Sequence, residues 1–210
     1  MRRSLTAPVS DFVRHPMNAI ELRARVTRPY WSRRLGELGQ GTILHRPMWV
    51  YGAHKMSIGA HTLILHGAWL SVQHEAWEHP GHALRIGDRV AIRPNCVVSV
   101  SDSIIIEDDV IIAAFSTIID SDHTFAAGRP NVMHNPVTTA PVRIGRGTWI
   151  SERVAVLKGS TIGRCCIIGA NSVVRGDIPD YSIAVGAPAR VVGSVEGVDA
   201  DAEPVSNALW

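Results

Sequence analysis

The stretch RIGRGTWISERVAVLKGSTIGRCCIIGANSVV, residues 143–174, repeats one pattern every six residues. A large aliphatic residue recurs on a single frame: Ile144, Ile150, Val156, Ile162, Ile168 and Val174. A small or β-branched residue stands four positions after each of the first five: Thr148, Val154, Ser160, Cys166 and Ser172. A period of six fits neither a helix nor a strand with a long turn, but it is the period of a β-helix built from hexapeptides. We therefore expect each hexad to form one short strand and one corner, with both marked positions pointing inward.

The same pattern extends toward the N-terminus. The aliphatic positions there are Ile86, Ile92, Val98 and Ile104, then Ile106, Ile112 and Ile118 in a frame shifted by two, and a weaker run at Ile58 and Ile64. Because one hexad cannot bury its apolar face alone, stacked coils must form a continuous core. The pattern predicts an all-β hexapeptide-repeat solenoid. Glycines follow the aliphatic residue in several hexads and are expected to ease corners where positive φ is costly for other residues.

The composition narrows the class of protein. Of 210 residues, 46% are apolar, 19% are charged and 6% are aromatic, and the formal net charge is +2. These values argue against disorder and against nucleic-acid binding, which needs a strongly basic domain. No apolar segment follows Arg2 and Arg3 as in a signal peptide, and the longest apolar run, 110–115, is far short of the ~20 residues that span a bilayer. We expect no integral membrane segment.

Three cysteines without a CxxC spacing form no disulfide or metal framework, which favours a reducing cytoplasm. Cys96 and Cys166 fall on the small inward position and are expected to be core residues.

The chain divides into three parts. Residues 1–50 are expected to form an N-terminal arm or cap with a short helix over 17–26, ended by Pro29. Its arginines beside Tyr30 and Trp31 leave open a surface for membranes or acidic partners. Residues 51–193 form the solenoid, and 194–210 an acidic, disordered tail. The spacing of 26 between Ile118 and Ile144 is not a multiple of six, so 120–143 is expected to be an extruded loop.

Three stretches resemble a known family: IRPNCVV (92–98), IIDSDHTF (118–125) and the run from Pro141 to Val192. On these motifs, residues 57–192 resemble the hexapeptide-repeat acyltransferases. Within them they are most similar to the sugar O-acetyltransferases of the maltose, galactoside and nodulation type and of polysaccharide gene clusters. The resemblance implies a left-handed parallel β-helix, a homotrimer with active sites between subunits, and acetyl-CoA lying along the coils as acyl donor.

Site residues follow from the resemblance position by position. His123 matches the catalytic base and Asn95 an acceptor-binding asparagine. The positions that match CoA contacts are Ala170, Val174 and Arg175. Arginine suits phosphate geometry, so Arg175 and Arg190 are expected either to bind the CoA phosphates or to be solvated surface charges.

The chemistry requires a base rather than a metal. A histidine with a pKa near the working pH can accept the proton of a sugar hydroxyl as the oxygen attacks the thioester. Asp122 or Asp120 is a candidate to orient its ring. Trp149 is either a residue that packs between coils at a corner or a platform on which the acceptor stacks.

The predicted function is acetyl-CoA-dependent O-acetylation of a sugar or polysaccharide precursor, by direct transfer in a ternary complex. The alternatives are N-acetylation of an amino-sugar nucleotide or antibiotic, and a trimeric scaffold without turnover. A third is a γ-type carbonic anhydrase, whose zinc needs three histidines. Five histidines raise this possibility: His61, His66, His74, His79 and His82.

Overall fold

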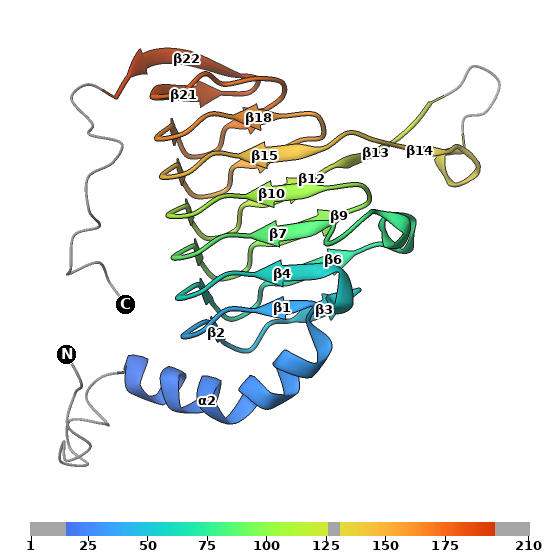
Figure 1. Ribbon diagram of the computed structural model, residues 1–210. Helices are drawn as coiled ribbons and strands as arrows, with labels where there is room; N and C mark the ends of the chain where they lie inside the picture. The colour runs from blue at the N-terminus through green and yellow to red at the C-terminus, as the bar shows by residue number, and fades with distance from the viewer. Residues whose placement is uncertain (1–15, 126–130, 196–210) are drawn as a thin grey trace.

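Three parallel β-sheets, called A, B and C here, make up most of the computed structural model, which describes residues 16–125 and 131–195 (Figure 1). Sheet A contains β1 (Glu37–Leu38), β4 (Met56–Ile58), β7 (Leu84–Ile86), β10 (Ile104–Ile106), β15 (Val142–Ile144) and β18 (Thr161–Ile162). Sheet B contains β2 (Ile43–Leu44), β5 (Leu63–Ile64), β8 (Ala91–Ile92), β11 (Ile111–Ile112), β16 (Trp149–Ile150), β19 (Ile167–Ile168) and β21 (Ser182–Gly186), closed by the antiparallel β22 (Ala189–Ser194). Sheet C contains β3 (Trp49–Tyr51), β6 (Trp69–Val72), β9 (Val97–Val100), β12 (Thr117–Ile119), β17 (Ala155–Val156) and β20 (Val173–Val174).

The chain visits sheets A, B and C in turn, so that each passage through the three makes one coil of the stack in Figure 1. Equivalent residues of successive coils pair in register, as Ile92, Ile112 and Ile150 do in sheet B. The predicted core frame is confirmed. Every aliphatic residue of the frame is at most 3% exposed, and the small companion positions, Cys96 and Cys166 included, are at most 1% exposed. Burial raises the pKa of the Cys96 thiol to about 11.

The corners differ from the expectation in their use of glycine. Positive φ falls on residues such as Arg89, Asn95 and Cys165, at the ends of strands in sheets A and B, and not on the glycines that follow the aliphatic frame residue. Those glycines are needed for another reason. A Cβ at Gly163 would lie 2.4 Å from the backbone nitrogen of Asp180 in the next coil. Close approach between coils, rather than corner strain, therefore excludes a side chain there.

The N-terminal helix is longer than predicted. Helix α2 (Pro16–Arg34) runs through Pro29 and lies across the first coil (Figure 1), so the predicted end of the helix at Pro29 is wrong. Packing outweighs the hydrogen bond lost at proline: Leu35 is buried in the core, Trp31 packs against it, and Arg28 donates to the carbonyl oxygens of Leu38 and Gly39. The strands begin at Glu37, before the expected boundary at residue 51.

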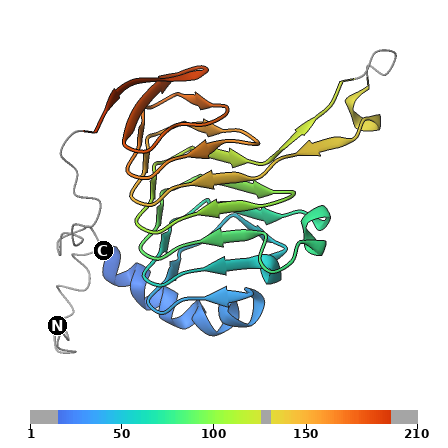
Figure 2. The same cartoon turned by 45° about the horizontal axis from the view of Figure 1, so that its top comes forward.

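The segments that leave the stack all do so between sheet C and sheet A. They are the short helices η1 (Ala53–Lys55) and η2 (His74–Glu78) and the hairpin of β13 (Ser121–His123) and β14 (Val137–Thr139), with η3 (Val132–His134) near its tip. Figure 2 shows this hairpin projecting from the stack. The expected acidic tail lies outside the described residues, except for its start. Within the described residues no helix has the length and apolar character needed to cross a membrane.

Candidate functional site

The hairpin that carries His123 begins directly after β12, where the repeat frame breaks. Its register pairs Asp122 with Thr138 and His123 with Val137. Because neighbouring side chains in a strand point to opposite faces, Asp122 and Thr138 share one face of the hairpin, and His123 and Val137 share the other. The sequence thus correctly predicted a segment extruded from the stack, with His123 near its base.

The predicted partners of His123 are occupied elsewhere. The carboxylate of Asp122 lies 3.6 Å from the Nζ of Lys158, which also donates to the Thr138 hydroxyl. Lys158 thus holds one face of the hairpin against the coil that contains β17. His123 is exposed on the opposite face, and its imidazole has no hydrogen bond or ion pair with the part of the chain that the structure describes. Asp122 does not orient the imidazole of its own subunit, because its side chain lies on the opposite face of the hairpin and pairs with Lys158.

Asp120 is fully buried at the root of the hairpin. Its carboxylate accepts hydrogen bonds from the backbone N–H groups of Ser101, at 2.7 Å, and Asp102, at 2.9 Å, while its carbonyl oxygen accepts one from Ala140. Desolvation raises the pKa of this carboxyl group, and the two N–H donors oppose the rise. Asp120 therefore anchors the hairpin to the preceding coil rather than orienting His123.

The raised pKa of Asp120 has a consequence for stability. A carboxyl group that binds its proton more tightly in the folded chain than in the unfolded one contributes stability below the unfolded pKa and loses it as pH rises through the folded pKa. We therefore compare the free energies of unfolding of the wild type and of Asp120→Asn. The wild-type value minus the variant value is expected to fall as pH rises above the ordinary aspartate pKa. Urea unfolding across the acid range measures this difference. The exposed Asp177→Asn serves as control, and parallel pH profiles for wild type and Asp120→Asn would contradict the assignment.

A hollow of about 400 Å³ lies near the hairpin, at the edge of sheet C formed by its last two strands, β17 and β20. Its lining includes Leu157 and Val173 from the sheet, Arg175, and the segment from Ala187 to Arg190. The structure thus brings Arg175, which follows the last strand of sheet C, together with Arg190, which lies in β22 beyond the repeat. Leu157 is followed directly by Lys158, which contacts the hairpin, so the hollow and the base of the hairpin are adjacent. Three cationic side chains gather in this region.

Two other residues expected to touch CoA lie elsewhere. Val174 is fully buried in the core, so its side chain does not reach the surface. Ala170 is exposed at the corner between sheets B and C, at the other end of β20 from Arg175, and it does not line the hollow. Of the four residues predicted to contact the donor, the structure brings two to one place.

Asn95 and His123 are not brought together within one subunit. Asn95 has a φ of 60° at the corner that precedes β9, and its Oδ1 packs over Gly67 of the coil before. The pairing of β9 with β12 puts His123 beyond the opposite end of sheet C. Asparagine tolerates the left-handed conformation, which accounts for its presence at this corner. Trp149 lies within strand β16, not at a corner, with half of its ring exposed on the outer face of sheet B between Ile111 and Ile167.

The histidines that suggested a zinc site are distributed over the stack. His61 lies at the corner between sheets A and B, His66 between B and C, and His74 on η2. Among the described residues no cluster of three or more His, Cys, Asp or Glu side chains has the arrangement of a metal site.

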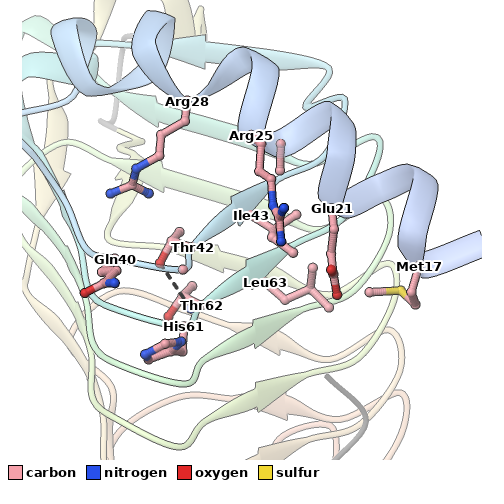
Figure 3. Close-up of a pocket in the computed structure, with 12 residues that line it drawn as sticks. Met17, Glu21, Arg25, Arg28, Gln40, Thr42, Ile43, His61, Thr62 and Leu63 are labelled. Atoms are coloured by element: carbon pink, nitrogen blue, oxygen red, sulfur yellow. Dashed lines mark hydrogen bonds between the residues drawn. The ribbon is translucent and has the colours of Figure 1, made fainter. Parts of the chain in front are cut away.

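A second cavity, of about 490 Å³, lies between α2 and the first coils (Figure 3). Glu21 and Arg25 extend from the helix toward Ile43 and Leu63 of sheet B, with His61 at the side. No residue predicted for the site lines it. Sequence reasoning missed this cavity because it depends on how the part of α2 before Pro29 lies against the first coils, which no local pattern specifies.

Comparison with known proteins agrees with this architecture. Residues 141–176 match the sequence profile of the bacterial transferase hexapeptide family (six repeats). The probable acetyltransferase Rv3034c of Mycobacterium tuberculosis is 43% identical over 128 residues, which cover 60% of this chain and 42% of that protein. The putative lipopolysaccharide biosynthesis O-acetyl transferase WbbJ of Escherichia coli K12 is 39% identical over 72 residues, covering 33% of this chain and 37% of WbbJ. The chain matches less than half the length of either relative.

Two solved structures share the fold. The hexapeptide-repeat acetyltransferase VCA0836 of Vibrio cholerae, in complex with acetyl-CoA, has a TM-score of 0.59 at 20% identity and covers 93% of both chains. A variant of AntD, an N-acyltransferase of Bacillus cereus in complex with a dTDP-amino sugar and CoA, has a TM-score of 0.67 at 18% identity, covering 80% of this chain and 88% of AntD. The six-residue frame in three stacked sheets agrees with the hexapeptide-repeat profile that residues 141–176 match, and the chain is similar to hexapeptide-repeat acetyltransferases in sequence and fold.

Proposed function

We propose that this protein transfers an acetyl group from acetyl-CoA to a hydroxyl group of a sugar or polysaccharide precursor. One observation carries the proposal: the hollow that contains Arg175 and Arg190 adjoins the base of the hairpin that presents an exposed histidine. Guanidinium groups bind phosphate oxygens in a bidentate manner, and CoA is rich in phosphate. The donor hollow and the base of the hairpin that carries His123 are then neighbours in the stack.

In the proposed reaction, His123 accepts the proton of the acceptor hydroxyl while its oxygen attacks the thioester carbonyl carbon. The C–S bond breaks as the tetrahedral intermediate collapses, and the imidazolium returns the proton to the leaving CoA sulfur. The acetyl group passes directly to the acceptor within a ternary complex, so the protein forms no covalent intermediate and needs no metal. Acid–base catalysis of this kind contributes about 10²–10⁴-fold.

We further propose that the coil is left-handed and that three subunits form a homotrimer with the active sites between them, as the family resemblance implies. The exposed His123 supports this arrangement, because among residues 16–125 and 131–195 no group orients the ring. A neighbouring subunit would supply that contact and would complete the acceptor site, to which Asn95 and Trp149 remain candidate contributors. The three free cysteines fit a cytoplasmic setting.

The test is a thiol-release assay. Purified protein is incubated with acetyl-CoA and a panel of hydroxyl acceptors, from monosaccharides to oligosaccharides, and free CoA is measured with a thiol reagent. We expect acceptor-dependent release that disappears in His123→Ala. If no acceptor gives release above hydrolysis, the proposed function is wrong.

N-acylation of an amino sugar is the second candidate, and the similarity to AntD favours it. An amine is already a nucleophile when it is unprotonated, so transfer to an amine depends on pH through the acceptor as well as through the histidine. The same assay with amino-sugar acceptors distinguishes the two, because release with an amino sugar and not with its hydroxyl analogue would select N-acylation.

A further inference from the structure

Four exposed aromatic side chains form two pairs of neighbouring rings on strands β3 and β6 of sheet C and on η2, at the corner with sheet A. They are Trp49, Tyr51, Trp69 and Trp77, called the aromatic stripe here. The ring centroids of Trp49 and Trp69 are 5.7 Å apart, and those of Tyr51 and Trp77 are 5.9 Å apart. Trp49 and Tyr51 are two residues apart on β3 and therefore point to the same, outer face of the sheet. Each ring is between 37% and 50% exposed.

The rings are held in place rather than left free. The Nε1–H of Trp69 donates to the Ser71 hydroxyl at 3.1 Å, and that of Trp77 donates to the Val72 carbonyl oxygen at 3.2 Å. His54 packs edge-on against Trp77 with centroids 5.1 Å apart. A binding surface whose side chains are already ordered loses little conformational entropy when it binds a ligand. The stripe therefore has the rigidity of a preformed recognition surface.

The fold itself does not require aromatic residues at these positions. The register that starts at Trp49 and Trp69 continues across sheet C through Val97, Thr117, Ala155 and Val173, which are all aliphatic or small. Aromatic residues are only 6% of the chain, yet three of its six tryptophans lie in the stripe. An exposed apolar patch of this kind on an otherwise ordinary sheet face indicates a binding surface.

The stripe and the donor hollow lie on opposite sides of the hairpin. The hydroxyls of Ser121 and Ser101 are 3.3 Å apart, so the hairpin face with Ser121 and His123 turns toward the coils that precede it, which include the stripe. The other face, with Asp122, contacts Lys158 beside the hollow. His123 thus faces the side of the stripe, while the donor is expected on the other side.

We propose that the aromatic stripe binds the sugar rings of the acceptor, which makes the acceptor an oligosaccharide rather than a monosaccharide. This rests on the proposed function. A pyranose ring presents an apolar C–H face that can stack on an aromatic ring, and hydroxyls at its edge that need polar partners. The edge of the stripe provides such partners in Ser99 and Gln73, whose side chains both hydrogen-bond Ser71. Each of these side chains has further hydrogen-bonding capacity beyond its bond to Ser71, which a sugar hydroxyl can use and a purely apolar partner cannot.

The distance to His123 supports an acceptor of several rings. Thr117, the register partner of Trp69 in β12, is two strands away, which is about 10 Å across the sheet, and His123 follows Thr117 by six residues, at most about 20 Å of extended chain. One sugar ring does not span that distance. A chain of rings bound on the stripe can reach the histidine with a more distant hydroxyl.

The test uses Trp69→Ala and Trp49→Ala with cellotriose and maltotriose as acceptors. We expect the KM of the better trisaccharide to rise about tenfold, which corresponds to about 1.4 kcal/mol, because the variant loses the ring on which a sugar stacks. The KM of acetyl-CoA stays unchanged, and Trp69→Phe restores most of the affinity because it keeps a ring. Tyr30→Ala is the matched control, since it removes an exposed aromatic residue of α2 whose ring contacts Trp31 and is not part of the stripe.

Binding without turnover separates this proposal from the proposed function. Trisaccharide quenching of tryptophan fluorescence that is lost in Trp69→Ala supports the stripe even if no CoA is released. Wild-type KM values in both alanine variants, or no trisaccharide binding to the wild type, would overturn it. Sedimentation velocity on the variants provides the third outcome: loss of the oligomer in Trp69→Ala would mean that the stripe contacts another copy of the chain, and the proposal would be wrong.

Discussion

His123→Ala will lower kcat for acetyl transfer by about 10²–10⁴-fold, the usual contribution of a positioned general base. The KM of acetyl-CoA is expected to stay near that of the wild type, because the hollow with Arg175 and Arg190 does not include the histidine. The melting temperature should also be unchanged, because the imidazole is exposed and has no hydrogen bond or ion pair with the described part of the chain. Steady-state thiol release and thermal unfolding measure these three quantities on one preparation.

The matched control is Val137→Ala. Val137 is the cross-strand neighbour of His123 and is 44% exposed, so its truncation perturbs the same hairpin without removing the imidazole. We expect Val137→Ala to retain activity within a few-fold. A comparable loss of kcat in both variants would mean that the hairpin matters as a structure, and His123 would not be the base. Full activity of His123→Ala would exclude the proposed mechanism directly.

Ile112→Ala will lower the free energy of unfolding by about 2–5 kcal/mol, which is a large share of the 5–15 kcal/mol typical of a folded domain. Ile112 is fully buried and is stacked between Ile92 and Ile150 of the neighbouring coils. Truncating it removes buried methyl groups and leaves a cavity that rigid strands on both sides cannot close. Urea unfolding followed by far-UV circular dichroism measures this difference. All variants are compared at the same protein concentration, because the apparent stability of an oligomer depends on it.

Ile111→Ala is the control within the same strand. Ile111 precedes Ile112, points to the outer face of sheet B and is 40% exposed. The same chemical change should therefore cost well under half as much, because it removes less buried surface and opens no internal cavity. Equal losses for the two variants would contradict the assignment of inward and outward faces that the six-residue frame predicts.

The fold was predictable because the repeat specifies it many times over. Each hexad places one aliphatic and one small residue inward, and an error at one position, such as the shift between Ile104 and Ile106, does not disturb the others. In β10 both of these residues are buried, one at each end of a three-residue strand, so the frame shift is absorbed by a longer strand. The role of the corner glycines was predicted wrongly because the contact that excludes their side chain comes from the next coil, about 20 residues away in sequence.

The site was predictable only in part. The break in the frame correctly predicted where His123 leaves the stack, but the partners of Asp120 and Asp122 depend on which coil each faces after folding. Arg175 and Arg190 were each predicted as phosphate ligands from their residue type. That they line one hollow was not predictable, because the segment between β21 and β22 does not follow the six-residue repeat. The tryptophans of the stripe had no signal at all in the sequence, because Trp49, Trp69 and Trp77 become neighbours only through the register of sheet C.

By itself the sequence determined the repeat frame, the inward positions and the single long interruption, because these depend on periodicity along the chain. The tertiary structure decided which side chains meet across coils: the lysine that holds the hairpin, the two arginines of the hollow, the packing that carries α2 through Pro29, and the aromatic stripe. The physical reason is the same in each case. A stack of coils brings together residues about 20 positions apart at each step, and which of them meet depends on the insertions between strands, which the repeat does not specify.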